Sequence, residues 1–192
     1  MGNRRIGRKR LYGVEKAGQS IDLESGAGMA ANIKSASQHR QGQEIITEIA
    51  IDLDGLTCGN ADKDVIGKTT ASYITQLTAA KFGIITEVRV VCVETIVNTA
   101  EDITGHGVDV EAGTGAAGVA SGAGGGATGG ATRTVMVHSV RVAGSDTSVV
   151  QATNALEDLY LYVVNGETAT SDEITAGKII VYIHGFVAPA DL

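Results

Sequence analysis

The segment 83–97, GIITEVRVVCVETIV, is the longest run of apolar, β-branched residues in the chain and most constrains its fold. Branching at Cβ stiffens χ1 and suits a pleated sheet better than a helix. Alternate residues of a strand point to opposite faces, so one face would be dry, formed by Ile84, Thr86, Val88, Val90 and Cys92. The opposite face would be mixed, formed by Ile85, Glu87, Arg89, Val91 and Val93. One dry and one mixed face predict an antiparallel sandwich.

Other segments repeat this pattern. In 44–53, polar residues alternate with a row that would face the core, namely Ile45, Thr47, Ile49, Ile51 and Leu53. Further strands are predicted over 134–142, 159–164 and 178–187, with loops over 56–70, 144–154 and 167–175. Segment 73–78 favours a strand, and the alternative is a short helix over 71–80. The sequence predicts an all-β fold, an antiparallel β-sandwich of jelly-roll type.

The two ends of the chain differ in character. Residues 1–42 are poor in apolar anchors and predict an extended basic N-terminal arm that becomes ordered against a partner, or alternatively a disordered tail. Residues 43–192 would form the β-sandwich domain, with a Gly-rich insertion at 105–132. Nine glycines fall within 113–130, which predicts either a mobile surface loop or a segment packed tightly between subunits.

Charge is distributed unevenly along the chain. Residues 1–16 hold six basic side chains and one acidic one, a net charge of +5, whereas the rest holds nine basic and 21 acidic residues, a net charge of −12. A basic arm on an acidic body is typical of an interaction protein. The residues expected to bind a partner are Arg4, Arg5, Arg8, Lys9, Arg10 and Tyr12. Planar guanidinium groups suit the carboxylates of a protein partner, and five charges with one aromatic ring would hold nucleic acid only loosely.

No motif in the sequence predicts chemistry, so we expect no enzyme activity, catalytic residue, cofactor site or metal site. Gly113, Gly115 and Gly118 match G-x-G-x-x-G, but the Gly-rich segment after them cannot sustain the helix that a dinucleotide site needs. Residues 60, 62 and 64 resemble half of a calcium loop without its glycine and final acid. Cys92 and His138 lack spaced catalytic partners. No apolar run reaches the length of about 18 residues of a membrane-spanning helix.

Four stretches, NRRIGRKRLYGVEKAGQ, HRQGQEIITEIAIDL, YITQLTAAKFGIITEVRVVCVE and AGKIIVYIHGF, resemble small virion structural proteins of marine tailed bacteriophages. The resemblance spans both ends of the chain and skips the Gly-rich insert. It implies a particle component made in many copies. A chain this short with so little helix does not suit the major capsid shell protein, whose fold needs a long spine helix. It suits a capsid decoration (cement) protein that contacts the major capsid protein and its own copies as a homotrimer. Its location would then be the virion capsid, after assembly in the host cytoplasm. The alternatives are a tail or neck component, and a nucleic-acid-binding module that uses the basic arm.

Overall fold

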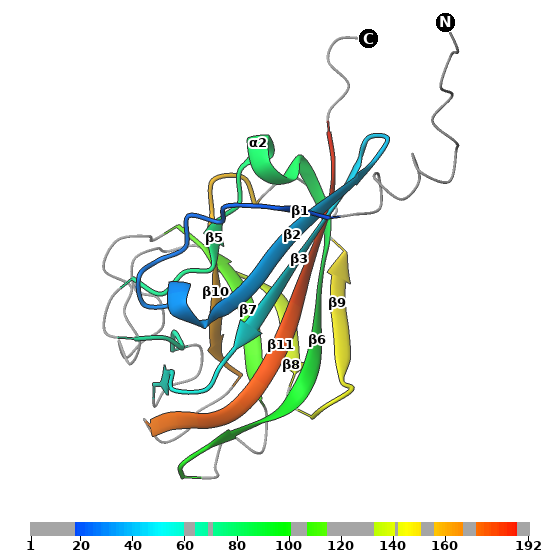
Figure 1. Cartoon of the computed structure of the whole chain (residues 1–192). Coiled ribbons are helices and arrows are strands. Elements are labelled where there is room, and N and C mark those ends of the chain that lie inside the picture. The colour runs from blue at the N-terminus through cyan, green and yellow to red at the C-terminus, as the bar shows by residue number, and fades with distance from the viewer. Residues whose placement is uncertain are drawn as a thin grey trace, which may run out of the picture.

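A computed structural model of the chain (Figure 1) describes residues 18–59, 64–68, 71–100, 107–114, 133–140, 142–150, 156–166 and 172–187. Helices are few and short in these residues, namely η1 (Ala30–Asn32), a 3-10 turn, and α2 (Ala79–Phe82). The strands are β1 (Gln19–Ser20), β2 (Ile33–Gln41), β3 (Glu44–Asp52), β4 (Thr57–Cys58), β5 (Thr75–Gln76), β6 (Ile84–Asn98), β7 (Val108–Gly113), β8 (Arg133–Val140), β9 (Asp146–Val150), β10 (Tyr160–Asn165) and β11 (Asp172–Phe186).

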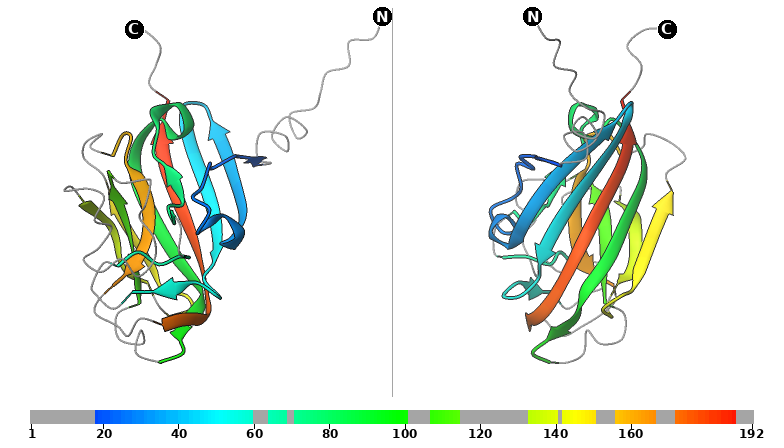
Figure 2. Two further views of the ribbon diagram at one scale, coloured as in Figure 1. Left: turned by 90° about the vertical axis from the view of Figure 1, so that its left-hand side faces the viewer. Right: turned by 45° about the vertical axis from the view of Figure 1, so that its right-hand side comes forward.

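The strands form two antiparallel sheets that pack face to face (Figure 2). The larger sheet has the order β1-β2-β3-β11-β6-β9, with β4 also paired to β11, and the smaller has the order β5-β10-β7-β8. Apolar side chains from both sheets meet in one buried cluster, among them Ile49, Val90 and Val181 from the larger sheet and Val110 and Val163 from the smaller one. The predicted all-β, antiparallel sandwich is therefore confirmed.

The strands pair in a nested order. β7 pairs with β8, β6 with β9, β5 with β10 and β3 with β11, so early strands pair with late ones. As a result β11, the last strand, lies in the middle of the larger sheet between β3 and β6. Closing the fold therefore requires the two ends of the sandwich sequence to meet.

The predicted alternation holds in the strands of the larger sheet. In β3, Ile45, Thr47, Ile49 and Ile51 are buried and the residues between them are half-exposed. In β6, the dry face is confirmed at Val88, Val90 and Cys92, all of which are fully buried.

Two irregularities in β6 change which residues face outward. Glu87 pairs with His184 but Ile85 pairs with Gly185, so Thr86 is an extra residue. This shift buries Ile85 and leaves Ile84 exposed, so the predicted placement of these two residues was wrong. Further along β6, Val93 is extra in the same way, since the register passes from Glu94 directly to Cys92. Such a bulge bends the strand and re-aims its side chains.

The predicted boundary between arm and sandwich at residue 43 is also wrong for the part of the arm that is described. β2 forms a hairpin with β3 along its full length, turning at Gly42, whose φ is +65°. β1 pairs with β2 in turn. The polar sequence of β2 had suggested a free arm, but a strand near a sheet edge gains its hydrogen bonds from the backbone and needs few apolar side chains. Residues 1–17 lie outside the described residues.

The described parts of segment 56–68 do not form the solvated loop that its polarity predicted. Leu56, Cys58, Val65 and Ile66 are fully buried, and Thr57 and Gly67 form an isolated bridge. Segment 73–78 contains the predicted strand only as the two residues of β5, and the helical turn α2 follows it.

Strands β7 and β9 also fall where an insertion and a loop were predicted. β9 lies within 144–154 and pairs with β6, while β7 lies within the predicted insertion at 105–132. Every residue of β7 is buried, including Asp109 and Glu111, which is why no alternation marks it in the sequence. Residues 115–132 lie outside the described residues.

Candidate interaction surface

The larger sheet has one broad face that points away from the core, and Figure 2 (right) shows this face across β2, β3, β11, β6 and β9. We call it the outer face. Its side chains are half-exposed or exposed and come from the three central strands, namely Ile46, Glu48, Ala50 and Asp52 of β3, Ile180, Tyr182 and His184 of β11, and Glu87, Arg89, Val91 and Val93 of β6. The register sets them in cross-strand rows, for example Glu48, Tyr182 and Arg89.

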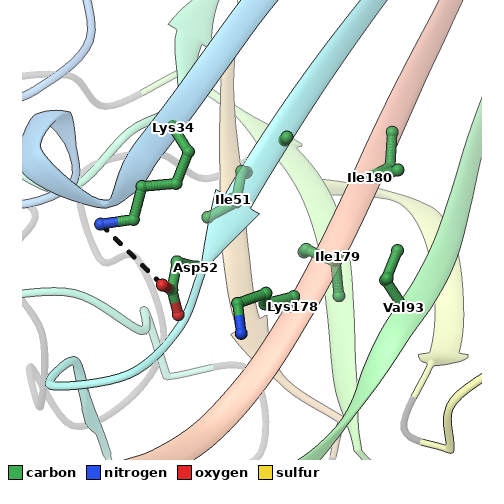
Figure 3. Close-up of a pocket in the computed structure, with 8 residues that line it drawn as sticks. Lys34, Ile51, Asp52, Val93, Lys178, Ile179 and Ile180 are labelled. Carbon is green, nitrogen blue, oxygen red and sulfur yellow. Dashed lines mark ion pairs between the residues drawn. The ribbon is translucent and has the colours of Figure 1, made fainter.

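An apolar groove of about 320 Å³ crosses one end of this face (Figure 3). It is lined by Lys34, Ala50, Ile51, Asp52, Val93, Lys178, Ile179 and Ile180. The bulge in β6 supplies Val93, half of whose surface is exposed, and also turns Glu94 toward Lys178. The groove therefore combines an aliphatic floor with charged side chains at its rim.

The Lys side chains at the groove end of the outer face form ion pairs with neighbouring carboxylates. Lys178 pairs with Glu94, and Lys34 Nζ lies 3.9 Å from Asp52 Oδ2 at the groove. The hydrogen bond to Glu94 raises the pKa of Lys178, so this group stays charged. Exposed pairs of this kind contribute little to stability, and their effect here is to fix where charge lies.

Arg89 joins β6 to the edge strand β9. Its guanidinium donates hydrogen bonds to both carboxylate oxygens of Asp146, with 2.7 Å between Nε and Oδ1. That hydrogen bond lowers the pKa of Asp146. The same guanidinium lies 5.9 Å from the ring centroid of Tyr182. Burial, with the nearby Glu48 carboxylate, raises the pKa of Tyr182, which keeps its hydroxyl protonated.

Carboxylates remain on this face once the ion pairs are accounted for. Among the residues that the structure describes, Glu44, Glu48 and Glu87 form no ion pair with a Lys or Arg. Glu44 Oε1 lies 4.0 Å from His184 Nδ1, and Glu48 hydrogen-bonds to Tyr182. The end of the outer face away from the groove is thus acidic.

The predicted partner-binding residues of the arm, Arg4, Arg5, Arg8, Lys9, Arg10 and Tyr12, all lie outside the described residues. The description begins at Gly18, whose missing Cβ would lie 2.8 Å from the ring of His39. β1 runs antiparallel to β2, with Gln19 opposite Gln38. Traced toward the N-terminus, β1 therefore points to the tip of the β2–β3 hairpin, next to the acidic end of the outer face.

The cysteine and histidine side chains do not form a reactive pair in the described part of the chain. Cys92 is buried, burial raises the pKa of its thiol, and its Sγ donates a hydrogen bond to the Glu94 carbonyl 3.1 Å away. His184 points to the outer face, His106 lies outside the described residues, and only the backbone of His138 is described, in β8. Cys92 thus occupies a core position, where a thiol acts as a small apolar group.

The other motifs weighed from the sequence have structural positions. Asp64, from the partial calcium pattern, is fully buried, and its carbonyl accepts a hydrogen bond from the Asn165 amide. Gly113 ends β7, while Gly115 and Gly118 lie outside the described residues. Within the described ranges, no group of three or more His, Cys, Asp or Glu side chains is arranged to hold a metal ion. No helix in those ranges is long and apolar enough to span a membrane.

Comparisons with protein families, with curated proteins and with solved structures find no match to this chain. The surface was not predicted from the sequence as a site. Its mixed strand faces were visible there, but the groove depends on the cross-strand register and on the bulge at Val93.

Proposed function

We propose that the chain is a virion structural protein, a capsid decoration (cement) protein that stabilises a phage head. The observation that carries the proposal is the combination of an acidic sandwich, whose widest sheet face is exposed, with an N-terminal stretch of net charge +5. Such a layout suits attachment to copies and neighbours. The sequence resemblance to phage virion proteins supports the same function.

The nested strand pairing supports a jelly-roll description of the sandwich. When strands pair first with last and inward in order, the chain is a long antiparallel hairpin that has been rolled into two layers. Jelly rolls have eight strands in two sheets and recur in viral capsid proteins. This likeness of fold favours a structural role.

The mechanism of stabilisation would be avidity. One arm with a few charged contacts binds weakly, but many copies arranged by shell symmetry bind together, and linked contacts gain effective concentration. In this proposal the sandwich sits on the shell as a homotrimer, and residues 1–17 reach the major capsid protein and neighbouring copies. Arg4, Arg5, Arg8, Lys9 and Arg10 supply the charge, and Tyr12 supplies an apolar contact.

The test compares attachment of full-length and altered chains to phage heads that lack this protein. We expect Arg8→Glu with Arg10→Glu to reduce the amount bound at least tenfold, while the sandwich keeps its circular dichroism spectrum and thermal midpoint. Arg8→Lys with Arg10→Lys is the matched control, because it keeps the charge and should retain most of the binding. Normal decoration by the charge-reversed chain would contradict the proposal, as would a cryo-reconstruction with this density only in the tail or neck.

Nucleic-acid binding through the basic stretch is the competing function from another class. A filter-binding assay with DNA distinguishes the nucleic-acid function from the decoration function. It is run at about 0.15 M salt, because binding through phosphates falls steeply as salt rises and loose binding to DNA is then suppressed. Under the proposal, deleting residues 1–16 leaves DNA retention unchanged at background. Retention that depends on those residues would favour the nucleic-acid function instead.

A further inference from the structure

We infer that the outer face of the larger sheet is the binding site for residues 4–12 of a second copy of this chain. This inference rests on the proposed function, in which the basic N-terminal stretch makes the contacts between copies. It adds the surface that receives the stretch and the side chains that hold it.

Charge complementarity is the first argument. The Lys and Arg side chains of the outer face are already paired with Asp52, Glu94 and Asp146. Glu48 and Glu87 flank Tyr182 and His184 with no basic partner in the described residues, and Glu44 lies at the same end. Arg8 and Arg10 of an incoming chain would give these carboxylates their guanidinium partners.

Apolar contact is the second argument. The incoming stretch carries large apolar side chains that would be buried on binding, namely Ile6, Leu11 and Tyr12. The groove offers Val93, Ala50 and Ile180 at its surface, and its charged rim leaves the floor free for aliphatic contact. An exposed apolar strip bordered by polar residues is typical of an interaction site.

The lengths agree. From Lys178 at the groove to Phe186 at the acidic end, β11 spans eight residue steps, which is about 27 Å in a strand. Residues 4–12 also span eight steps, about 27 Å when extended. One stretch can therefore place Leu11 or Tyr12 at the groove while Arg4 or Arg5 reaches the acidic end.

The direction of β1 favours a second copy over the same copy. Since β1 is antiparallel to β2, β1 traced back to Gly18 points toward the tip of the β2–β3 hairpin and away from the groove. The same copy's stretch would have to reverse direction and return across the face. The stretch of a neighbour can enter along the sheet without a turn, and a repeated head-to-tail contact of this kind suits a ring of copies.

Photo-crosslinking on the full-length chain tests the inference. Tyr12 is replaced by p-benzoylphenylalanine in a ¹⁵N-labelled chain, which is mixed with unlabelled chain, irradiated and analysed by mass spectrometry. We expect crosslinks between the labelled and unlabelled copies, to peptides within 44–52, 84–98 or 172–186. Crosslinks confined to the same copy, or to other surfaces, would overturn the inference.

Charge reversal on the receiving face gives the matched comparison. Glu48→Lys with Glu87→Lys should lower the crosslink yield at least tenfold. Asp22→Lys with Glu157→Lys reverses two exposed acids that lie outside the strands of the larger sheet and should leave the yield unchanged. If the first variant fails to fold, the isosteric pair Glu48→Gln with Glu87→Gln replaces it, with an expected loss of at least threefold. Equal yields in the face and control variants would overturn the inference.

The crosslinking result and the head-attachment result together distinguish an error in the receiving surface from an error in the proposed function. If charge reversal of Arg8 and Arg10 abolishes attachment to heads while crosslinks avoid the outer face, the proposed function stands and the receiving surface is wrong. If crosslinks map to the outer face while heads are decorated normally without residues 1–16, the surface is right and the proposed function is wrong.

Discussion

The two sheets of this sandwich meet the same core but differ on their other face. In β3 of the larger sheet, buried and half-exposed residues alternate strictly, and the outward side chains meet solvent. In the smaller sheet, all six residues of β7 are buried, and β10 is buried from Leu161 to Asn165. The larger sheet thus has an exposed face, whereas β7 and most of β10 in the smaller sheet are buried on both faces.

Chain segments far from β10 in sequence explain this difference. Val65 bridges to Val164, and the amides of Ile66 and Ile74 donate hydrogen bonds to carbonyls of β10. Val65 forms a second small apolar cluster with Tyr162 and Val164, and Tyr73 and Tyr160 pack against it. The rings of Tyr73 and Tyr160 meet edge to face with centroids 4.9 Å apart. These contacts cover β10, whereas the outward side chains of the larger sheet stay half-exposed or exposed.

The largest expected effect contrasts the two faces of β6. Val90→Asp places a charge in the dry core and should cost about 4 kcal/mol or more, enough to prevent folding. Val93→Asp puts the same side chain at the exposed bulge and should cost about 1 kcal/mol or less. Urea unfolding monitored by circular dichroism measures both. A folded Val90→Asp protein would mean that the dry face has been assigned to the wrong side.

A smaller and more discriminating effect compares neighbouring valines truncated to alanine. On β10, Val163→Ala and Val164→Ala should each lower the free energy of unfolding by about 2 kcal/mol, because both faces of that strand are buried. On β6, Val90→Ala should cost about 2 kcal/mol, but Val91→Ala, on the half-exposed face, about 1 kcal/mol or less. If Val164→Ala were as mild as Val91→Ala, the contrast between the sheets would fail.

The smallest effect concerns the charges of the larger sheet. Because Arg89 lowers the pKa of Asp146, the pair stabilises the fold above the ordinary pKa of Asp, and this contribution disappears as the pH falls through the lowered value. Arg89→Gln should return the pKa of Asp146 toward its ordinary value and reduce stability slightly at pH values above that ordinary pKa, with no effect at low pH. NMR titration of the Asp146 carboxyl group measures this shift. An unchanged titration in the variant would show that solvent screening removes the coupling.

Sequence patterns predicted the strands that have one buried face and one exposed face. Alternation in β3 and in the middle of β6 placed Ile49, Val88 and Val90 correctly, because one wet face leaves a period of two in the sequence. The same rule missed β7, since Asp109 and Glu111 looked like loop residues although both are buried. It also missed β2, whose polar residues are held in the sheet by backbone pairing with β3.

The sequence likewise predicted one part of the candidate site and missed another. The sequence identified its charged ingredients, with a basic stretch at one end and an acidic remainder. It could not predict the groove, because Asp52 and Lys178 come together only through the pairing of β3 with β11, which are far apart in the chain. The bulge that exposes Val93 is likewise a property of two paired strands.

By itself the sequence determined the class of fold, the aliphatic core and the uneven distribution of charge, because these depend on side-chain polarity and short periodicity. Only the tertiary structure decided which sheet is covered, that β11 lies at the centre of the larger sheet, and which side chains share the outer face. Those outcomes depend on long-range pairing, in which a single extra residue such as Thr86 or Val93 changes what faces solvent.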